Sequence, residues 1–138
     1  MLPWELLATA SAPQGDTLRL LRRGTEYSIR LEGGNELMNS RLGGSEESLA
    51  TLTLDRIGAR PAPRLLIGGL GMGFTLRAAL AATPAAAQVV VSEIVPDLIG
   101  WAHGPMAEVF GGCLEDPRVL LRAGDVAAEI RTAAPPYD

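Results

Sequence analysis

Hydrophobic and polar residues alternate along two neighbouring segments near the start of the chain, as they do in half-buried strands. The alternation runs through residues 16–23 and again through 26–32, and the two segments flank a short turn at Gly24. This pattern predicts a β-hairpin. A second turn leads into residues 36–40, a candidate third strand. We therefore expect a small antiparallel β unit in the first forty residues.

Helical signals follow this unit. Ser45 can cap a helix, Glu46 and Glu47 suit the positive end of its dipole, and an apolar face is expected from three positions, Leu49, Leu52 and Ile57. Prolines at 61 and 63 exclude a helix and weaken a strand. We place a domain boundary there. Residues 1–60 form a β unit with a connecting helix, and residues 61–138 form the second part.

Short apolar runs alternate with helical segments in the second part. The runs cover residues 65–67, 88–93 and 118–122, and the helical segments cover residues 74–82, 96–102 and 126–132. A β-α-β-α-β-α order requires crossover connections, so it predicts an α/β fold with a parallel sheet. Ligands bind such sheets at the carboxyl ends of the strands.

A glycine cluster follows the first of these runs. Gly68, Gly69, Gly71 and Gly73 precede the helix at once. Glycines allow positive φ and a close approach of the backbone to a ligand, and the helix N-terminus directs its amides at that ligand. The turn therefore predicts a site for a nucleotide-like ligand, although a merely tight strand-to-helix turn is the alternative.

Two carboxylates follow the next two strands. Glu93 lies about 20 residues beyond the glycine turn, where an acidic side chain accepts hydrogen bonds from both ribose hydroxyls. The alternative is a solvated or helix-capping carboxylate. Asp125 follows the third strand and is placed to accept a hydrogen bond from the exocyclic amine of adenine. The alternative is that it caps a helix.

Composition narrows the function classes. The chain has 138 residues, a net charge of −4 and no Lys, which excludes a Walker-type phosphate loop and Schiff-base chemistry. It shows no basic stripe, so nucleic acid is not an expected partner. The single cysteine, Cys113, excludes an internal disulfide and, without partner ligands, makes a zinc site improbable. No apolar run is long enough for a membrane span. We expect a cytoplasmic protein in which Trp101 packs in the core, His103 is a surface or loop residue and Cys113 is unreactive.

The glycine spacing does not fit the dinucleotide fingerprint, because its sixth place falls on Phe74. The alternation of glycines from 69 to 73 instead resembles the S-adenosylmethionine-binding fold of class I methyltransferases. The order and spacing of further motifs resemble the spermidine synthase family: residues 36–41, 45–50, 67–69, 75–77, 92–94, 116–119 and 124–125.

This resemblance implies that residues 61–138 are the first half of a Rossmann-like nucleotide-binding domain. It assigns Gly69, Gly71 and Gly73 to the amino acid and ribose end of the ligand, Glu93 to the ribose and Asp125 to the adenine. The implied ligands are S-adenosylmethionine, decarboxylated S-adenosylmethionine or methylthioadenosine, and the implied reaction is methyl or aminopropyl transfer.

The chain departs from the family pattern at several places. Leu70 and Met72 stand where the family carries an Asp in the glycine turn, and Val95 stands where an acidic residue is expected. The family's catalytic Asp follows a strand that begins just after a pair like Tyr137-Asp138, so the catalytic residue is unknown here and we expect the unit to be incomplete.

Two expectations follow from that incompleteness. The first parallel strand would lack its neighbour on one side, which favours self-association into a homo-oligomer. A non-catalytic binding or assembly module of the same fold is also an alternative to a transferase. An NAD-dependent oxidoreductase domain is a third reading, which the glycine spacing disfavours.

Overall fold

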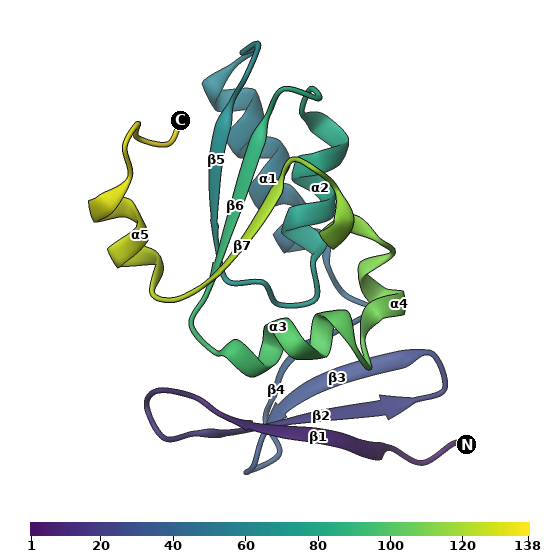
Figure 1. Cartoon of the computed structure of the whole chain (residues 1–138). Helices are drawn as coiled ribbons and strands as arrows, with labels where there is room; N and C mark the ends of the chain where they lie inside the picture. Colours follow the sequence, from purple (N-terminus) through teal and green to yellow (C-terminus); the bar gives the residue numbers. More distant parts are fainter.

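Two β-sheets joined by helices make up the computed structural model, which describes all 138 residues (Figure 1). The first sheet is antiparallel, with its strands in chain order: β1 (Glu5–Ser11), β2 (Thr17–Arg23), β3 (Glu26–Leu31) and β4 (Glu36–Asn39). The predicted hairpin and third strand are confirmed as β2, β3 and β4. Strand β1 lies within the β unit predicted for the first forty residues, but its bounds were not predicted, because most of its residues are partly or fully exposed and its sequence alternates only weakly.

The register of the antiparallel sheet places its apolar residues on one face. Leu20 lies opposite Ile29, and both side chains are fully buried. Residues on alternate positions of a strand share one face, so the pair anchors the sheet against the rest of the molecule.

The second sheet is parallel, in the order β5-β6-β7, and follows the predicted alternation of strands and helices. Its elements are β5 (Arg64–Gly68), α2 (Phe74–Ala82), β6 (Gln88–Glu93), α3 (Pro96–His103), β7 (Val119–Ala123) and α5 (Val126–Thr132). Two short helices, α4 (Ala107–Phe110) and a 3₁₀ turn (Cys113–Glu115), interrupt the connection between α3 and β7. The expected α/β fold, a parallel sheet preceded by an antiparallel β unit, is confirmed.

Helix α1 (Gly44–Ile57) connects the two sheets and packs against α2. Its predicted cap was wrong: the N-cap is Gly43, without a side-chain hydrogen bond, and the Ser45 hydroxyl bonds to Glu46. The predicted apolar face was also wrong in part, because Leu49 and Leu52 are exposed. The helix turns Ala50 inward instead, since a small side chain lets α1 and α2 approach closely.

The hydrophobic core runs continuously through both parts of the chain. It joins Leu20 and Ile29 of the antiparallel sheet to Val89 and Val91 of β6. Helix α3 lies between the two sheets in Figure 1, and its Trp101 is buried in the same cluster, as predicted. No helix combines the length and the apolar character needed to cross a membrane.

Candidate functional site

The glycine turn between β5 and α2 has the backbone conformation expected from its sequence. Gly69, Gly71 and Gly73 have φ values of 96°, 54° and 80°, which L side chains rarely adopt. The N–H of Gly73 donates to the carbonyl of Leu70, and Gly73 is the N-cap of α2. The turn therefore opens directly onto the positive end of the α2 dipole.

Glu93, the last residue of β6, lies against this turn. Its Oε1 accepts the backbone N–H of Leu70 at 2.9 Å, and its Oε2 accepts the N–H of Val95 at 3.1 Å. The residue is only 5% exposed. A carboxylate has about four lone-pair positions, so both oxygens keep capacity for a further donor.

Backbone bonds hold the carboxyl ends of the three parallel strands together. The Gly69 N–H donates to the carbonyl of Ser92, and the Gly124 N–H donates to the carbonyl of Glu93, each at 2.8 Å. The Ser92 hydroxyl donates to the Gly124 carbonyl at 2.9 Å. The glycine turn and Glu93 are thus brought to one edge of the sheet.

A cavity of about 840 Å³ extends from this edge along β5. Most of its lining residues are hydrophobic, and its charged residues are all acidic: Glu46, Glu93 and Asp138. Asp138 forms an ion pair with Arg60 at 2.8 Å, whereas the side chain of Glu46 is in no ion pair. No Arg lines the cavity. The site is therefore suited to a neutral or cationic ligand with a large apolar surface.

The antiparallel sheet supplies part of the cavity wall, which the sequence did not predict. Leu37, Met38 and Asn39 of β4 line the cavity. The sulfur of Met38 lies 3.6 Å from the position that a Cβ on Gly71 would occupy. No local sequence signal marks these residues, because their place at the site depends on how the two sheets pack.

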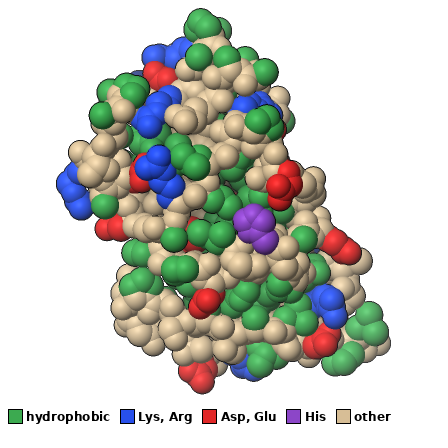
Figure 2. All heavy atoms as spheres, viewed as in Figure 1, with side chains coloured by type: hydrophobic (Ala, Val, Ile, Leu, Met, Phe, Trp, Pro, Cys, Tyr) green, Lys and Arg blue, Asp and Glu red, His purple; other side chains and the backbone are tan.

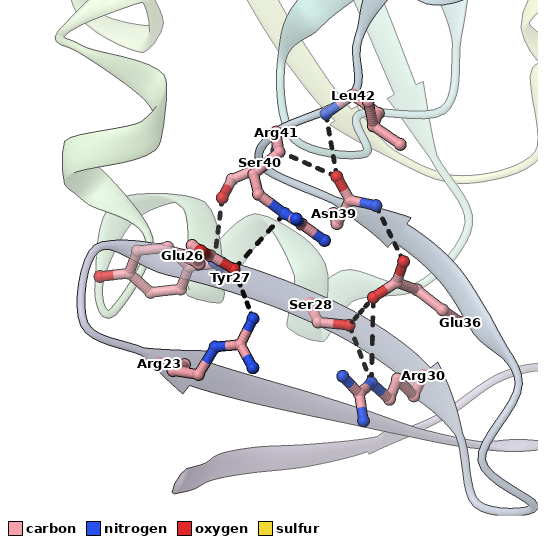
Figure 3. A network of polar contacts seen from close by, with 10 residues as sticks. All are labelled: Arg23, Glu26, Tyr27, Ser28, Arg30, Glu36, Asn39, Ser40, Arg41 and Leu42. Carbon is pink, nitrogen blue, oxygen red and sulfur yellow. Dashed lines mark hydrogen bonds and ion pairs between the residues drawn. The ribbon is translucent and has the colours of Figure 1, made fainter. Parts of the chain in front are cut away.

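A polar network fixes the end of β4 (Figure 3). The Ser28 hydroxyl and the Asn39 amide donate hydrogen bonds to the Glu36 carboxylate. Both bonds lower the pKa of Glu36, and the bond from Ser28 has the larger effect. Asn39 Oδ1 accepts the backbone N–H groups of Arg41 and Leu42 at 3.0 and 2.9 Å. The network thereby holds the segment that enters α1 beside the cavity.

The structure does not bring every predicted site residue to the cavity. Asp125 is exposed, caps α5 by accepting the Ala127 N–H at 3.0 Å, and does not line the cavity. Gly73 is buried and faces Phe110, whose ring lies 2.7 Å from the position of an added Cβ. Gly69 and Gly71 do line the cavity. Asp125 thus caps its own helix, and Gly73 packs against α4.

The other residues considered for chemistry lie away from the cavity. The exposed His103 contacts the carbonyl of Ile99 through Nδ1 at 3.0 Å. Burial raises the pKa of the Cys113 thiol. No group of three or more His, Cys, Asp or Glu side chains is arranged to hold a metal ion. On the face drawn in Figure 2, Arg side chains lie scattered among acidic and apolar groups.

Comparison with solved structures places this arrangement among known folds. Spermidine synthase from Thermotoga maritima superposes with a TM-score of 0.70 at 16% identity, covering 91% of this chain and 43% of that one. A spermidine synthase in complex with the transition-state analogue AdoDATO gives the same values. A probable spermidine synthase from Corynebacterium glutamicum gives a TM-score of 0.51 at 14% identity and covers 93% of this chain and 48% of that one. No protein-family model and no curated protein matches the sequence.

The two sheets, the glycine turn and the carboxylate at the end of β6 together define part of a methyltransferase-type α/β fold. More specifically, the chain has the fold of the corresponding part of the spermidine synthases, and it spans less than half the length of those structures.

Proposed function

We propose that the cavity binds an adenosyl sulfonium or thioether: S-adenosylmethionine, its decarboxylated form or methylthioadenosine. One observation carries the proposal: the buried Glu93 carboxylate lies against the Leu70 amide of the glycine turn, at the wall of a cavity whose charged residues are all acidic. The carboxylate suits the ribose diol, because it offers acceptors to two donors.

The residues present fit such a ligand. The position of a Cβ on Gly69 has no atom within 4 Å, so a ligand can approach the backbone there. Gly71 and Met38 form the adjoining wall. An acidic, Arg-free lining disfavours the pyrophosphate of NAD, which carries two negative charges. Asp125 keeps its second carboxylate oxygen as an acceptor while it caps α5, but it does not line the cavity, so we do not assign it to the adenine.

We further propose a spermidine-synthase-like transferase activity for the protein, by methyl or aminopropyl transfer. When bound, a sulfonium nucleoside supplies a carbon that is open to attack by a nucleophile. The residues of this chain would hold and orient the nucleoside and exclude water from it, and orientation is the main source of rate in such transfers. No residue is assigned as a general base.

A non-catalytic binding module is the second candidate, and one observation favours it. The glycine turn buries two apolar side chains, Leu70 and Met72, which are 4% and 2% exposed. The turn therefore presents no ionisable side chain of its own to a ligand. Binding without turnover is what this candidate predicts.

Isothermal titration calorimetry tests the proposal. S-adenosylmethionine and methylthioadenosine should each release heat, and NADH should not. Gly69→Ala should weaken binding by about tenfold or more, because its methyl group enters the cavity. Gly34→Ala is the matched control, since Gly34 also has a positive φ and open space but does not line the cavity. No heat with either adenosyl ligand, or tight NADH binding, would contradict the proposal.

A further inference from the structure

Three carboxylates line the cavity, and one of them, that of Glu46, has no structural partner in the protein. Both oxygens of Glu93 accept backbone N–H groups. Asp138 forms its ion pair with Arg60. Glu46 forms no ion pair, and its side chain accepts only the hydroxyl of its neighbour Ser45, at 3.0 Å through Oε2. Its Oε1 therefore has no partner within the chain.

Contacts between the first turns of α1 and α2 place Glu46 beside the glycine turn. The Thr75 hydroxyl of α2 donates to the Glu46 carbonyl at 3.0 Å. A Cβ on Gly43, the N-cap of α1, would overlap the Phe74 ring, so glycine is what lets the two helices approach this closely. Glu46 and Ala50 are four residues apart on one face of α1, and both line the cavity. The Glu46 side chain therefore comes from the cavity side of its helix.

The cavity wall offers no positive side chain to satisfy this carboxylate. No Arg is among its lining residues, and the chain contains no Lys. The single histidine, His103, is not among them either. A ligand that brings a positive charge therefore gains an attraction to Glu46 that a neutral ligand of similar shape does not gain. A carboxylate also accepts charge-assisted hydrogen bonds from an ammonium, which are stronger than neutral ones.

We propose that Glu46 makes the site favour adenosyl ligands with a positively charged group on the sulfur side over neutral thioethers. The inference rests on the proposed function, because it takes the ribose to lie at Glu93. Of the two ends of such a ligand, the adenine is neutral and suits the apolar side chains of Leu98 and Val126, which line the cavity. The charged end then lies toward the first turn of α1, where Glu46 receives it.

Isothermal titration calorimetry with a neutral and a charged nucleoside tests this role. Methylthioadenosine is neutral, whereas decarboxylated S-adenosylmethionine carries a sulfonium and an ammonium on the same adenosine. Glu46→Gln should weaken binding of the charged nucleoside by about fivefold and leave that of methylthioadenosine within about twofold. Glu47→Gln is the matched control, because Glu47 is an exposed residue of the same helical turn, forms no ion pair and does not line the cavity. The control should leave both affinities within about twofold. Circular dichroism checks that both variants fold.

Salt dependence separates the effect of charge from that of shape. Raising NaCl from about 20 to about 300 mM should weaken the charged nucleoside more in the wild type than in Glu46→Gln, because the variant lacks the carboxylate whose attraction is screened. The inference is overturned if Glu46→Gln leaves the preference between the two nucleosides unchanged, if Glu47→Gln alters it equally, or if the two salt dependences coincide. A wild type that binds neither nucleoside contradicts the proposed function itself, and this inference with it.

Discussion

Replacing Glu93 separates the two roles that the structure gives to its carboxylate. The side chain accepts the N–H groups of Leu70 and Val95 in a buried setting, and it also lines the cavity. A purely ligand-binding residue can be replaced without loss of stability. A residue that satisfies buried amides cannot, because each amide left without a partner costs about 1–3 kcal/mol.

The expected losses differ between two variants. Glu93→Ala leaves both amides unpaired and should lower the free energy of unfolding by about 2–6 kcal/mol. Glu93→Gln keeps one acceptor oxygen and turns a donor toward the other amide, so it should cost about 1–3 kcal/mol. At about 3 °C per kcal/mol, the corresponding falls in Tm are about 6–18 °C and about 3–9 °C.

Thermal unfolding followed by circular dichroism, without ligand, measures these losses. Glu32→Ala is the control, because Glu32 is exposed and its side chain makes no hydrogen bond or ion pair, and it should change stability by less than about 0.5 kcal/mol. If Glu93→Ala unfolds within 1 °C of the wild type, at about the precision of the assay, the carboxylate does not hold the glycine turn.

Two further predictions concern the glycine turn and the acid limit of stability. Gly73→Ala should destabilise the fold by about 2–5 kcal/mol, because its Cβ would meet the Phe110 ring and its φ is positive. Gly69→Ala should cost only the backbone strain of about 1–2 kcal/mol, because the position of its Cβ is open. Denaturant titrations measure both losses, and equal losses would refute the contrast. The hydrogen bonds from Arg118 lower the pKa of Asp116 to about 2, from an ordinary 3.8. Its charge therefore stabilises the fold above about pH 4 and ceases to do so as the pH falls toward 2. The Tm of Asp116→Asn should accordingly fall less than that of the wild type between about pH 4 and pH 2. Parallel profiles of Tm against pH would count against this linkage.

Local patterns predicted most of the secondary structure because they act within a few residues. The β-branched run of β6 and the alternation in β2 and β3 each specify a strand by themselves. Helix α2 begins and ends where the glycines and Thr83 predict. The orientation of α1 was not predictable in this way, since Ala50 and Leu49 compete for the inner face and only the packing against α2 decides between them.

The candidate site likewise has a part that local sequence predicts and a part that depends on tertiary packing. The spacing of Glu93 from the glycine turn was visible in the sequence, because both lie at the ends of neighbouring parallel strands. The bonds that Glu93 makes to the backbone, and the approach of Met38 to Gly71, depend on tertiary packing. The capping of α5 by Asp125 was one of two readings that its position after β7 allowed.

Amide chemical shifts during a titration with methylthioadenosine test the central claim most directly. If the glycine turn and Glu93 form one adenosyl-binding cleft, the ¹H–¹⁵N signals of Leu70 and Gly71 should shift in saturable fashion. The signal of Gly34, which does not line the cavity, should not shift. Signals at the turn that stay unchanged while the ligand is in excess, or shifts confined to other parts of the chain, would contradict it.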